Sequence, residues 1–183
     1  AIAQQAVTAA AAANNRFVLG IGLAHKVVIE DALGLSYAKP AAHMKEYLEI
    51  LEPLLNGETV NYEGEQYTVR GLSVGAAGAG QVPIIVAALG EKMLQLAGKH
   101  TSGTITWMVG PKTMSDHIVP VINEAAKRAG RSVPRIIAGT PIVLTNDPDS
   151  AREKIAQGLT VYGQLPSYRK MLDREGVGGP ADL

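Results

Sequence analysis

The sequence contains no cysteine, which excludes disulfide bonds, thiolate zinc sites and cysteine nucleophiles together. It has no excess of charge either, since 17 lysines and arginines balance 17 aspartates and glutamates. A nucleic-acid partner or an anionic membrane surface would call for a basic patch, so we expect neither. No apolar run reaches the roughly 18 residues of a membrane helix, and no signal peptide is visible. The lack of cysteine suits a cytoplasmic protein, which is the compartment we expect.

With 183 residues, of which 46% are hydrophobic, the chain has the composition of one globular domain. It opens on Ala1, already inside an alanine-rich helical pattern, with no initiator methionine and no leading strand. It stops at Leu183, just after a loop signal. We therefore expect residues 1–183 to form a single partial domain whose two ends are cuts.

Short apolar segments alternate with helical ones along the chain. The predicted strands are continuously apolar and lie at residues 17–22, 82–89, 103–108 and 134–144. The predicted helices are alanine-rich or carry apolar residues at three- and four-residue spacing, at 1–13, 40–55, 90–97, 113–129 and beyond 147. Alternation of strand and helix, with both strand faces apolar, predicts an α/β fold with a parallel sheet. Doubly wound sheets and closed barrels both satisfy this pattern.

Several local signals set boundaries within this alternation. Residues 59–62 and 66–69 flank a short turn and predict a β-hairpin, whereas the glycine-rich residues 71–80 predict a loop without strand content. Gly98 is expected to stop the helix that begins at Gly90. Thr113–Asp116 has the pattern of a capping box, which predicts a helix start there.

Two glycine-bearing strand ends are candidate binding elements. Gly20 and Gly22 close the first predicted strand, where parallel α/β folds bind ligands. No helix begins directly after them, which argues against a dinucleotide-binding fingerprint. The alternative is that these glycines only allow a tight turn from the strand into the loop. Gly90 separates the second strand from a helix, and the free N–H groups at a helix start favour a phosphate. The alternative there is a plain glycine cap, with Glu91 complementing the helix dipole.

The chain has four histidines, and none has metal-ligand spacing, so we expect no metal site. His25 follows a strand end and His43 lies in the first turn of its helix. His100 and His117 are expected on solvated surfaces. The single tryptophan, Trp107, either lines a cavity mouth or fills the core, and the core position is favoured.

Several segments, taken in order, form a pattern that is more specific than any single motif: Arg16–His25, His43–Leu48, Val86–Gly90, Leu96–Gly98 with Gly103–Thr104, Trp107–Pro111 and Val161–Ala181. Together these segments resemble the luciferase-like monooxygenase superfamily. The last segment, Val161–Ala181, is similar to an actinobacterial subgroup assigned to coenzyme F-420 (F420).

Members of that family are (β/α)8 TIM barrels, often dimers, that hold a flavin or deazaflavin at the C-terminal mouth of the strands. The resemblance implies that residues 17–22 are strand four and that residues 82–89, 103–108 and 134–144 are strands five to seven. Such a barrel needs about 250 residues. The expected fold is therefore an incomplete TIM barrel of the bacterial-luciferase type, about strands four to seven, with an inserted β-hairpin.

The resemblance also implies a function and a site. The protein is expected to be an oxidoreductase that transfers a hydride between coenzyme F420 and a small organic substrate, and to form a homodimer. Three residues, Gly22, Leu23 and His25, would line the coenzyme's ring and ribityl region, His25 also serving as the catalytic hydrogen-bond donor. His43 would lie near the coenzyme as a basic residue. The phosphate would bind the backbone amides of Ala88, Leu89 and Gly90.

Two alternatives stay open. An FMN-dependent monooxygenase of the same fold would couple reduced flavin to oxygen. A barrel portion without catalysis of its own would instead have to cover its unpaired edge strands by oligomerising.

Overall fold

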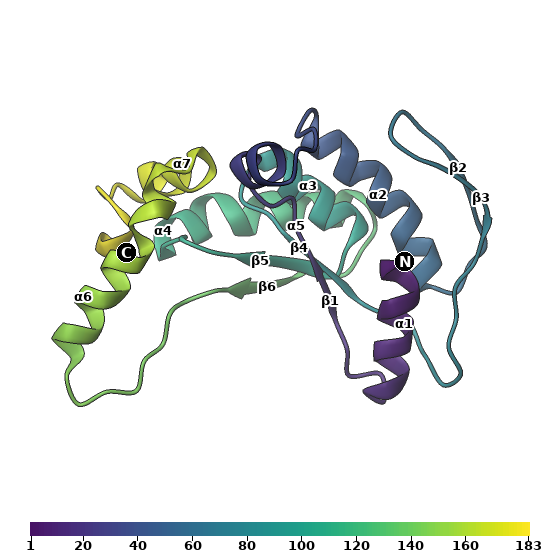
Figure 1. Ribbon diagram of the computed structural model, residues 1–183, viewed down its shortest axis with the longest axis horizontal. Helices are drawn as coiled ribbons and strands as arrows, with labels where there is room; N and C mark the ends of the chain where they lie inside the picture. The colour runs from purple at the N-terminus through teal and green to yellow at the C-terminus, as the bar shows by residue number, and fades with distance from the viewer. The chain divides into compact units, whose positions relative to one another are not determined.

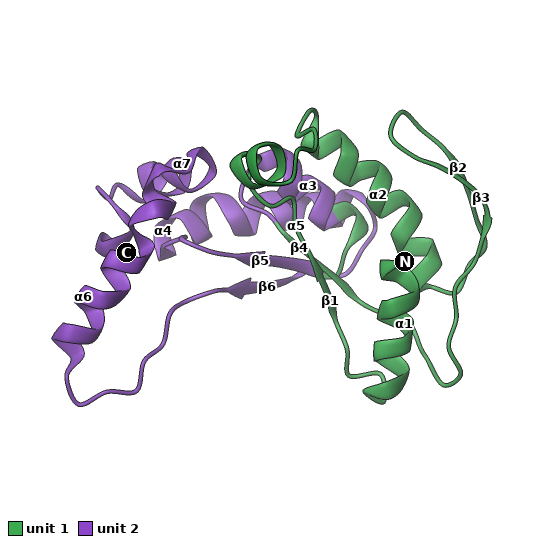
Figure 2. Ribbon diagram, viewed as in Figure 1, with its two compact units in different colours: residues 1–87, 99–102 green, residues 88–98, 103–183 purple.

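A computed structural model describes residues 1–183, and the chain divides into two compact units (Figure 1, Figure 2). Unit 1 comprises residues 1–87 and 99–102, and unit 2 comprises residues 88–98 and 103–183. None of the helices combines the length and the apolar character that a membrane crossing would require.

Unit 1 holds two parallel strands, two long helices and a hairpin. Its elements are α1 (Ile2–Ala12), β1 (Leu19–Ile21), the π-helix η1 (Val27–Ala32), α2 (Pro40–Leu55), β2 (Val60–Glu63), β3 (Thr68–Leu72) and β4 (Ile84–Ala87). The strands β1 and β4 pair in parallel, with Leu19 opposite Ile84, while β2 and β3 pair antiparallel. The expectation of parallel strands joined by helical connections is thereby confirmed.

Burial on both faces explains why β4 is apolar throughout. All of Ile84, Ile85 and Val86 in β4 are buried, although alternate side chains point to opposite faces. On α2 the buried apolar side chains recur at helical spacing. That helix starts at Pro40, where a missing N–H costs nothing, and ends before Gly57, whose φ of 83° is left-handed.

Unit 2 repeats the strand–helix alternation. Its elements are most of α3 (Glu91–His100), β5 (Gly103–Thr106), α4 (Pro111–Thr113), the π-helix η2 (Met114–Ile118), α5 (Val119–Arg128), β6 (Arg135–Ala138), α6 (Pro148–Leu159), the 3-10 helix η3 (Thr160–Gln164), α7 (Pro166–Glu175) and the 3-10 helix η4 (Pro180–Asp182). Strands β5 and β6 pair in parallel from Gly103–Arg135 to Thr106–Ala138.

The capping box predicted at Thr113–Asp116 is wrong, because the helical segment already begins at Pro111. The cap comes instead from a distant residue. The Glu175 carboxylate at the end of α7 accepts hydrogen bonds from Lys112 N at 3.0 Å and Thr113 N at 2.7 Å. With its backbone N–H occupied in this way, Thr113 turns its hydroxyl to the Met171 carbonyl oxygen.

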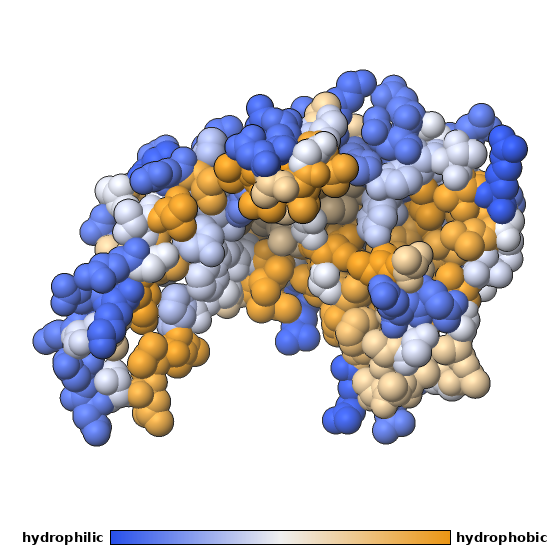
Figure 3. Space-filling model, viewed as in Figure 1, coloured by the Kyte–Doolittle hydropathy of each residue, from blue (hydrophilic) through white to orange (hydrophobic).

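The strand predicted over residues 134–144 is too long, since β6 ends at Ala138. The following loop contains Pro141, which has no N–H for a strand ladder. Ile142 and Leu144 are almost fully exposed there, and an apolar patch marks this loop between β6 and α6 in Figure 3. The length of an apolar run in the sequence therefore did not predict where the strand ends.

Two further boundaries differ from the sequence prediction. The loop expected from residue 71 begins later, because β3 includes Gly71 and Leu72. The helix expected to stop at Gly98 continues to His100. Gly98 does not end the helix but allows close packing: a Cβ there would lie 2.5 Å from the Ile122 carbonyl oxygen and 2.8 Å from the Ala125 Cβ.

Both histidines that were expected on solvated surfaces are buried, so that prediction is wrong. In each of them one ring nitrogen has a polar partner. His100 Nδ1 lies 3.3 Å from Glu52 Oε2, and burial lowers the pKa of His100 despite this carboxylate. The partner of His117 is the Leu89 carbonyl oxygen, at 2.8 Å from Nε2.

The close contact at Gly98 generates the first prediction. Gly98→Ala is expected to destabilise the protein by about 1–3 kcal/mol, because the methyl group meets backbone atoms of α5 that have no room to move. Gly158→Ala is the matched control: it lies in α6 with nothing within 4 Å of its Cβ position, and is expected to stabilise by up to about 1 kcal/mol. Urea unfolding of the two variants measures both effects. Equal stabilities would contradict the packing described for Gly98.

Candidate functional site

Unit 1 contains a pocket of about 620 Å³ at the C-terminal end of β1. This volume is in the usual range for sites that bind small molecules or cofactors. Five parts of the unit form the wall: the start of α1, the end of β1, the connection that follows it, α2 and the hairpin. The lining residues are Ile2, Gly20, Ile21, Gly22, Leu23, Ile29, Leu35, Ser36, Tyr37, Ala38, Pro40, His43, Met44, Tyr47 and Tyr67.

The backbone turns sharply where β1 enters the pocket. A Cβ at Gly22 would lie 3.2 Å from the Ala87 Cβ, so the absence of a side chain there permits close packing of β1 against β4. Two residues later Ala24 has a φ of 56°, in the left-handed region that non-glycine residues avoid. Its carbonyl oxygen accepts a hydrogen bond from the Tyr37 hydroxyl at 3.2 Å. The turn is therefore held from the other side of the pocket.

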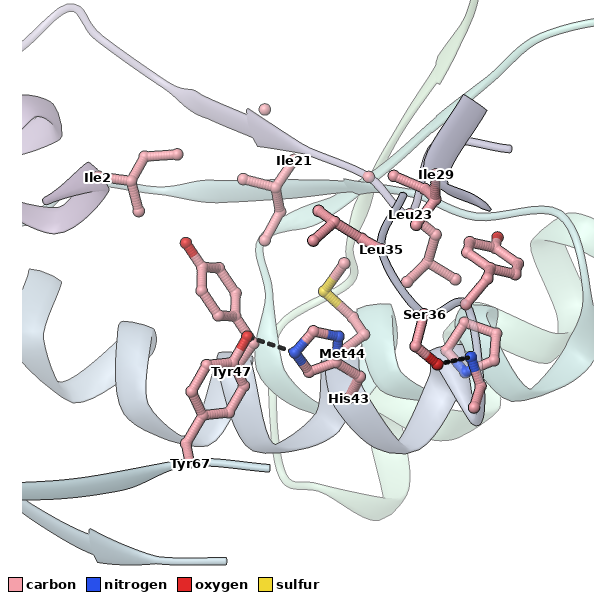
Figure 4. Close-up of a pocket in the computed structure, with 15 residues that line it drawn as sticks. Ile2, Ile21, Leu23, Ile29, Leu35, Ser36, His43, Met44, Tyr47 and Tyr67 are labelled. Atoms are coloured by element: carbon pink, nitrogen blue, oxygen red, sulfur yellow. Dashed lines mark hydrogen bonds between the residues drawn. The ribbon is translucent and has the colours of Figure 1, made fainter. Parts of the chain in front are cut away.

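A polar cluster interrupts the otherwise apolar wall. The Tyr67 hydroxyl lies 2.6 Å from His43 Nε2, and the two rings stack with centroids 5.0 Å apart. In Figure 4 the Tyr47 ring extends from α2 beside this pair, toward the side of the pocket that Ile2 and Ile21 form. Burial raises the pKa of both Tyr47 and Tyr67. Negative charge on Tyr47 and Glu46 raises the pKa of Tyr67 further. Both phenols are thus protonated at neutral pH and able to donate hydrogen bonds.

A carboxylate behind this cluster holds the hairpin that carries Tyr67. Glu46 on α2 is buried, and its carboxylate accepts hydrogen bonds from the backbone N–H groups of Glu65, Gln66 and Tyr67 at 2.9–3.1 Å. Burial alone would raise the pKa of Glu46. The three donors and the nearby Lys45 ammonium outweigh burial, so this pKa lies below its ordinary value of 4.5.

Of the site residues in unit 1 that were predicted from the sequence, three line the pocket and one lies beside it. Gly22, Leu23 and His43 line the pocket. His25 is not a lining residue; it is half-buried, and its carbonyl oxygen accepts hydrogen bonds from the first turn of the π-helix. Its catalytic role stays a prediction.

The predicted phosphate-binding residues belong to unit 2, at the start of α3. Ala88 is buried and Gly90 is exposed, with open space around the position of a Cβ. The first N–H groups of a ten-residue helix such as α3 lack intrahelical partners. Glu91, which could oppose an anion, directs its carboxylate along the helix to the Gln95 side chain. Since His117 donates to the Leu89 carbonyl oxygen, the junction is anchored by a buried side chain.

Trp107, at the end of β5, is half-buried and meets Tyr162 edge-on with ring centroids 6.1 Å apart. Its indole Nε1 is buried without a hydrogen-bond partner. Nearby, unit 2 has a second pocket of about 630 Å³, mostly apolar, with Arg152 as its charged lining residue. The Arg152 guanidinium pairs with Asp149 on the same helix, and both side chains are largely exposed.

No local sequence signal marks the residues that complete the first pocket. Tyr37, Tyr47 and Tyr67 come from three separate segments, and Glu46 acts through hydrogen bonds to a segment about twenty residues away. Only His43 and Tyr47, one helical turn apart, could have been paired by spacing.

Parallel strands, helical connections and a small-molecule pocket at a strand end define an α/β protein with a ligand site. The sequence profile of the luciferase-like monooxygenase family matches residues 1–182. The chain belongs to that family.

Several characterised relatives are similar over most of this chain. The 5,10-methylenetetrahydromethanopterin reductase of Archaeoglobus fulgidus is 32% identical over 166 residues, which are 88% of this chain and 48% of the relative. The F420-dependent glucose-6-phosphate dehydrogenase of Mycobacterium tuberculosis is 30% identical over 154 residues, or 81% of this chain and 46% of the relative. The chain thus spans about half the length of these relatives.

Solved structures agree in fold. The coenzyme F420 dependent tetrahydromethanopterin reductase from Methanopyrus kandleri superimposes with a TM-score of 0.80 at 26% identity, covering 96% of this chain and 55% of that one. An F420-dependent secondary alcohol dehydrogenase gives a TM-score of 0.78 at 18% identity, covering 99% of this chain and 58% of that one; at that identity the match shows the fold alone.

The two carboxylates that bind backbone N–H groups, those of Glu46 and Glu175, predict an acid-sensitive structure. Burial also raises the pKa of Glu175, but hydrogen bonds from Thr113 and Lys112 outweigh it, so both glutamates have folded pKa values below 4.5. A depressed folded pKa contributes stability above the unfolded value of about 4.5, and that contribution is lost as pH falls through the folded value. We expect the unfolding midpoint in urea to fall steeply below about pH 4.5.

The double variant Glu46→Gln, Glu175→Gln tests this dependence. It is expected to be less stable at neutral pH and to lose less stability on acidification, because neither position can then take up a proton. A urea midpoint that falls with pH as steeply in the variant as in the unmodified protein would show that other groups cause the acid sensitivity.

Proposed function

We propose that the protein is an oxidoreductase that transfers a hydride between coenzyme F420 and a small organic substrate. The observation that carries the proposal is membership of the luciferase-like family together with relatives, at 30% and 26% identity, whose names state dependence on F420. The pocket at the end of β1 supports it, since its size and apolar wall suit a planar ring system.

The proposal assigns two kinds of contact to the coenzyme. Gly22 and Leu23 line the coenzyme's ring and ribityl region, and His43 provides a polar group nearby. Backbone N–H groups at Ala88, Leu89 and Gly90 bind the phosphate, where the helix dipole favours an anion. Two observations agree with the phosphate contact: the Cβ position at Gly90 has open space, and Glu91 is turned toward Gln95.

When bound, the coenzyme would supply a ring carbon that exchanges a hydride with the substrate, while the protein orients the reactants. The aliphatic side chains of Ile21, Leu23 and Leu35 exclude water from the ring face. Polar contacts come from the phenol and imidazole groups of Tyr47, Tyr67 and His43. His25, beside the pocket, is proposed to donate a hydrogen bond to the ring or to the substrate.

We further propose that the chain forms about strands four to seven of a TIM barrel and that the protein is a cytoplasmic homodimer. The superposition on about half of the Methanopyrus kandleri reductase supports the barrel. So does the exposure of Ile142 and Leu144 beyond β6 (Figure 3), since further barrel segments would cover such side chains.

Coenzyme binding tests the proposed function. Titration of the protein into F420 is expected to quench the coenzyme's fluorescence saturably, whereas FMN is expected to bind at least about tenfold more weakly. Gly22→Val should lower F420 affinity by about tenfold or more, because its branched side chain enters the pocket beside Ala87. The control Gly158→Ala should bind as the unmodified protein does. Tighter binding of FMN would favour the monooxygenase alternative.

The role of His25 has its own test. His25→Ala is expected to lower F420 affinity or substrate turnover by about tenfold, the loss of one hydrogen bond to a bound group. The spectrum and melting temperature of the variant show whether the fold is retained. If both affinity and turnover persist in a folded His25→Ala protein, His25 is not a catalytic residue.

A further inference from the structure

The hairpin β2–β3 is attached to α2 at its tip by a single buried carboxylate. All three N–H donors to Glu46 are consecutive backbone groups, at residues 65, 66 and 67. A carboxylate with several N–H donors forms charge-assisted hydrogen bonds, which are stronger than neutral ones. The tip is therefore fixed by its backbone, independently of the side chains at residues 65 and 66.

The glycine at the tip leaves room for this contact. A Cβ at Gly64 would collide with the Glu46 carboxylate, and it would lie 2.7 Å from the Tyr62 ring. The neighbouring Gly64 N–H donates to the Tyr67 carbonyl oxygen and closes the turn. Close approach of the tip to α2 thus requires glycine at this position.

Other contacts between hairpin and helix are weaker or lie elsewhere. Lys39 and Glu65 form an ion pair at 3.2 Å, but both side chains are about 70% exposed, where such pairs contribute little. The Tyr62 hydroxyl donates to Glu49 at 2.7 Å, which raises the pKa of Tyr62 to about 12. That bond holds β2 and does not reach the pocket.

The third N–H bound by Glu46 belongs to Tyr67, whose side chain lines the pocket and contacts His43. Figure 4 shows the phenol of Tyr67 meeting the imidazole from the side of the hairpin. The chain of contacts therefore runs from Glu46 through the Tyr67 backbone and hydroxyl to His43. Removal of the first contact would weaken the support of the last one.

We propose that Glu46 is a positioning residue that holds Tyr67 in the pocket wall, and that the Tyr67–His43 pair hydrogen-bonds a carbonyl oxygen of the bound coenzyme. The second half rests on the proposed function. The pair is suited to it because the phenol and imidazole interrupt a wall made largely of aliphatic side chains. A polar ligand atom buried there would need such a partner.

Amide exchange and ring spectra of the ligand-free protein test the positioning role. Glu46→Gln replaces one acceptor oxygen by a donor, so amide hydrogens at residues 65–67 are expected to exchange about tenfold faster. The ring ¹⁵N signals of His43 should move in the same direction as in Tyr67→Phe, which removes the hydroxyl alone. The matched control is Glu49→Gln, one turn nearer the end of α2, which should leave the His43 signals unchanged.

Two results would overturn the positioning role: faster exchange without any change at His43, or no change in either measurement. If Glu46→Gln does not fold, Gly64→Ala provides the same test, because its methyl group displaces the tip from the carboxylate.

Binding of F420 tests the second half separately. Tyr67→Phe is expected to weaken binding by about three- to tenfold, the effect of one lost hydrogen bond. Unchanged affinity in that variant would refute the contact with the coenzyme. Failure of the unmodified protein to bind F420 would refute the proposed function, while the ligand-free measurements would still decide the role of Glu46.

Discussion

Backbone N–H groups at turns and helix starts have no partner within their own element, and in this chain carboxylates from distant residues bind two such groups of donors. Glu46 binds three N–H groups of the hairpin tip, and Glu175 binds two at the start of α4. Each carboxylate joins elements that helix and strand propensity alone would leave unconnected. The wall of the unit 1 pocket depends on the first of these contacts, since it places Tyr67 opposite His43.

The same constraint explains where glycine is required. Gly64 allows the hairpin tip to approach Glu46, and Gly110, just before α4, is packed against the Glu175 carboxylate. In both places a carboxylate occupies the space where a Cβ would lie. Gly98 serves apolar packing instead, between α3 and α5. At these positions glycine is required because other groups approach the backbone closely, whereas at Gly57 it is required because the backbone is left-handed.

Apolar runs and turn residues were sufficient to predict the alternation of strands and helices and the parallel pairing, because these depend on local pattern and on burial of both strand faces. Errors arose where a tertiary contact decides. The start of α4 depends on Glu175, and the burial of His100 and His117 depends on Glu52 and the Leu89 carbonyl oxygen. No property of a histidine's immediate neighbours distinguishes a buried hydrogen-bonded side chain from a solvated one.

The candidate site shows the same division between local and distant information. Gly22 and His43 could be named from the sequence, since a glycine at a strand end and a polar residue in a first helical turn are local signals. Tyr67 could not, because it reaches the pocket only through the pairing of its hairpin with α2. Family resemblance points to the coenzyme and to His43, but it says nothing about Tyr67, the second side chain of the pair that interrupts the apolar wall. Since polar groups in such a wall determine which ligand atoms can be buried against it, the hairpin is the part of unit 1 in which recognition could change while the strands and helices stay the same.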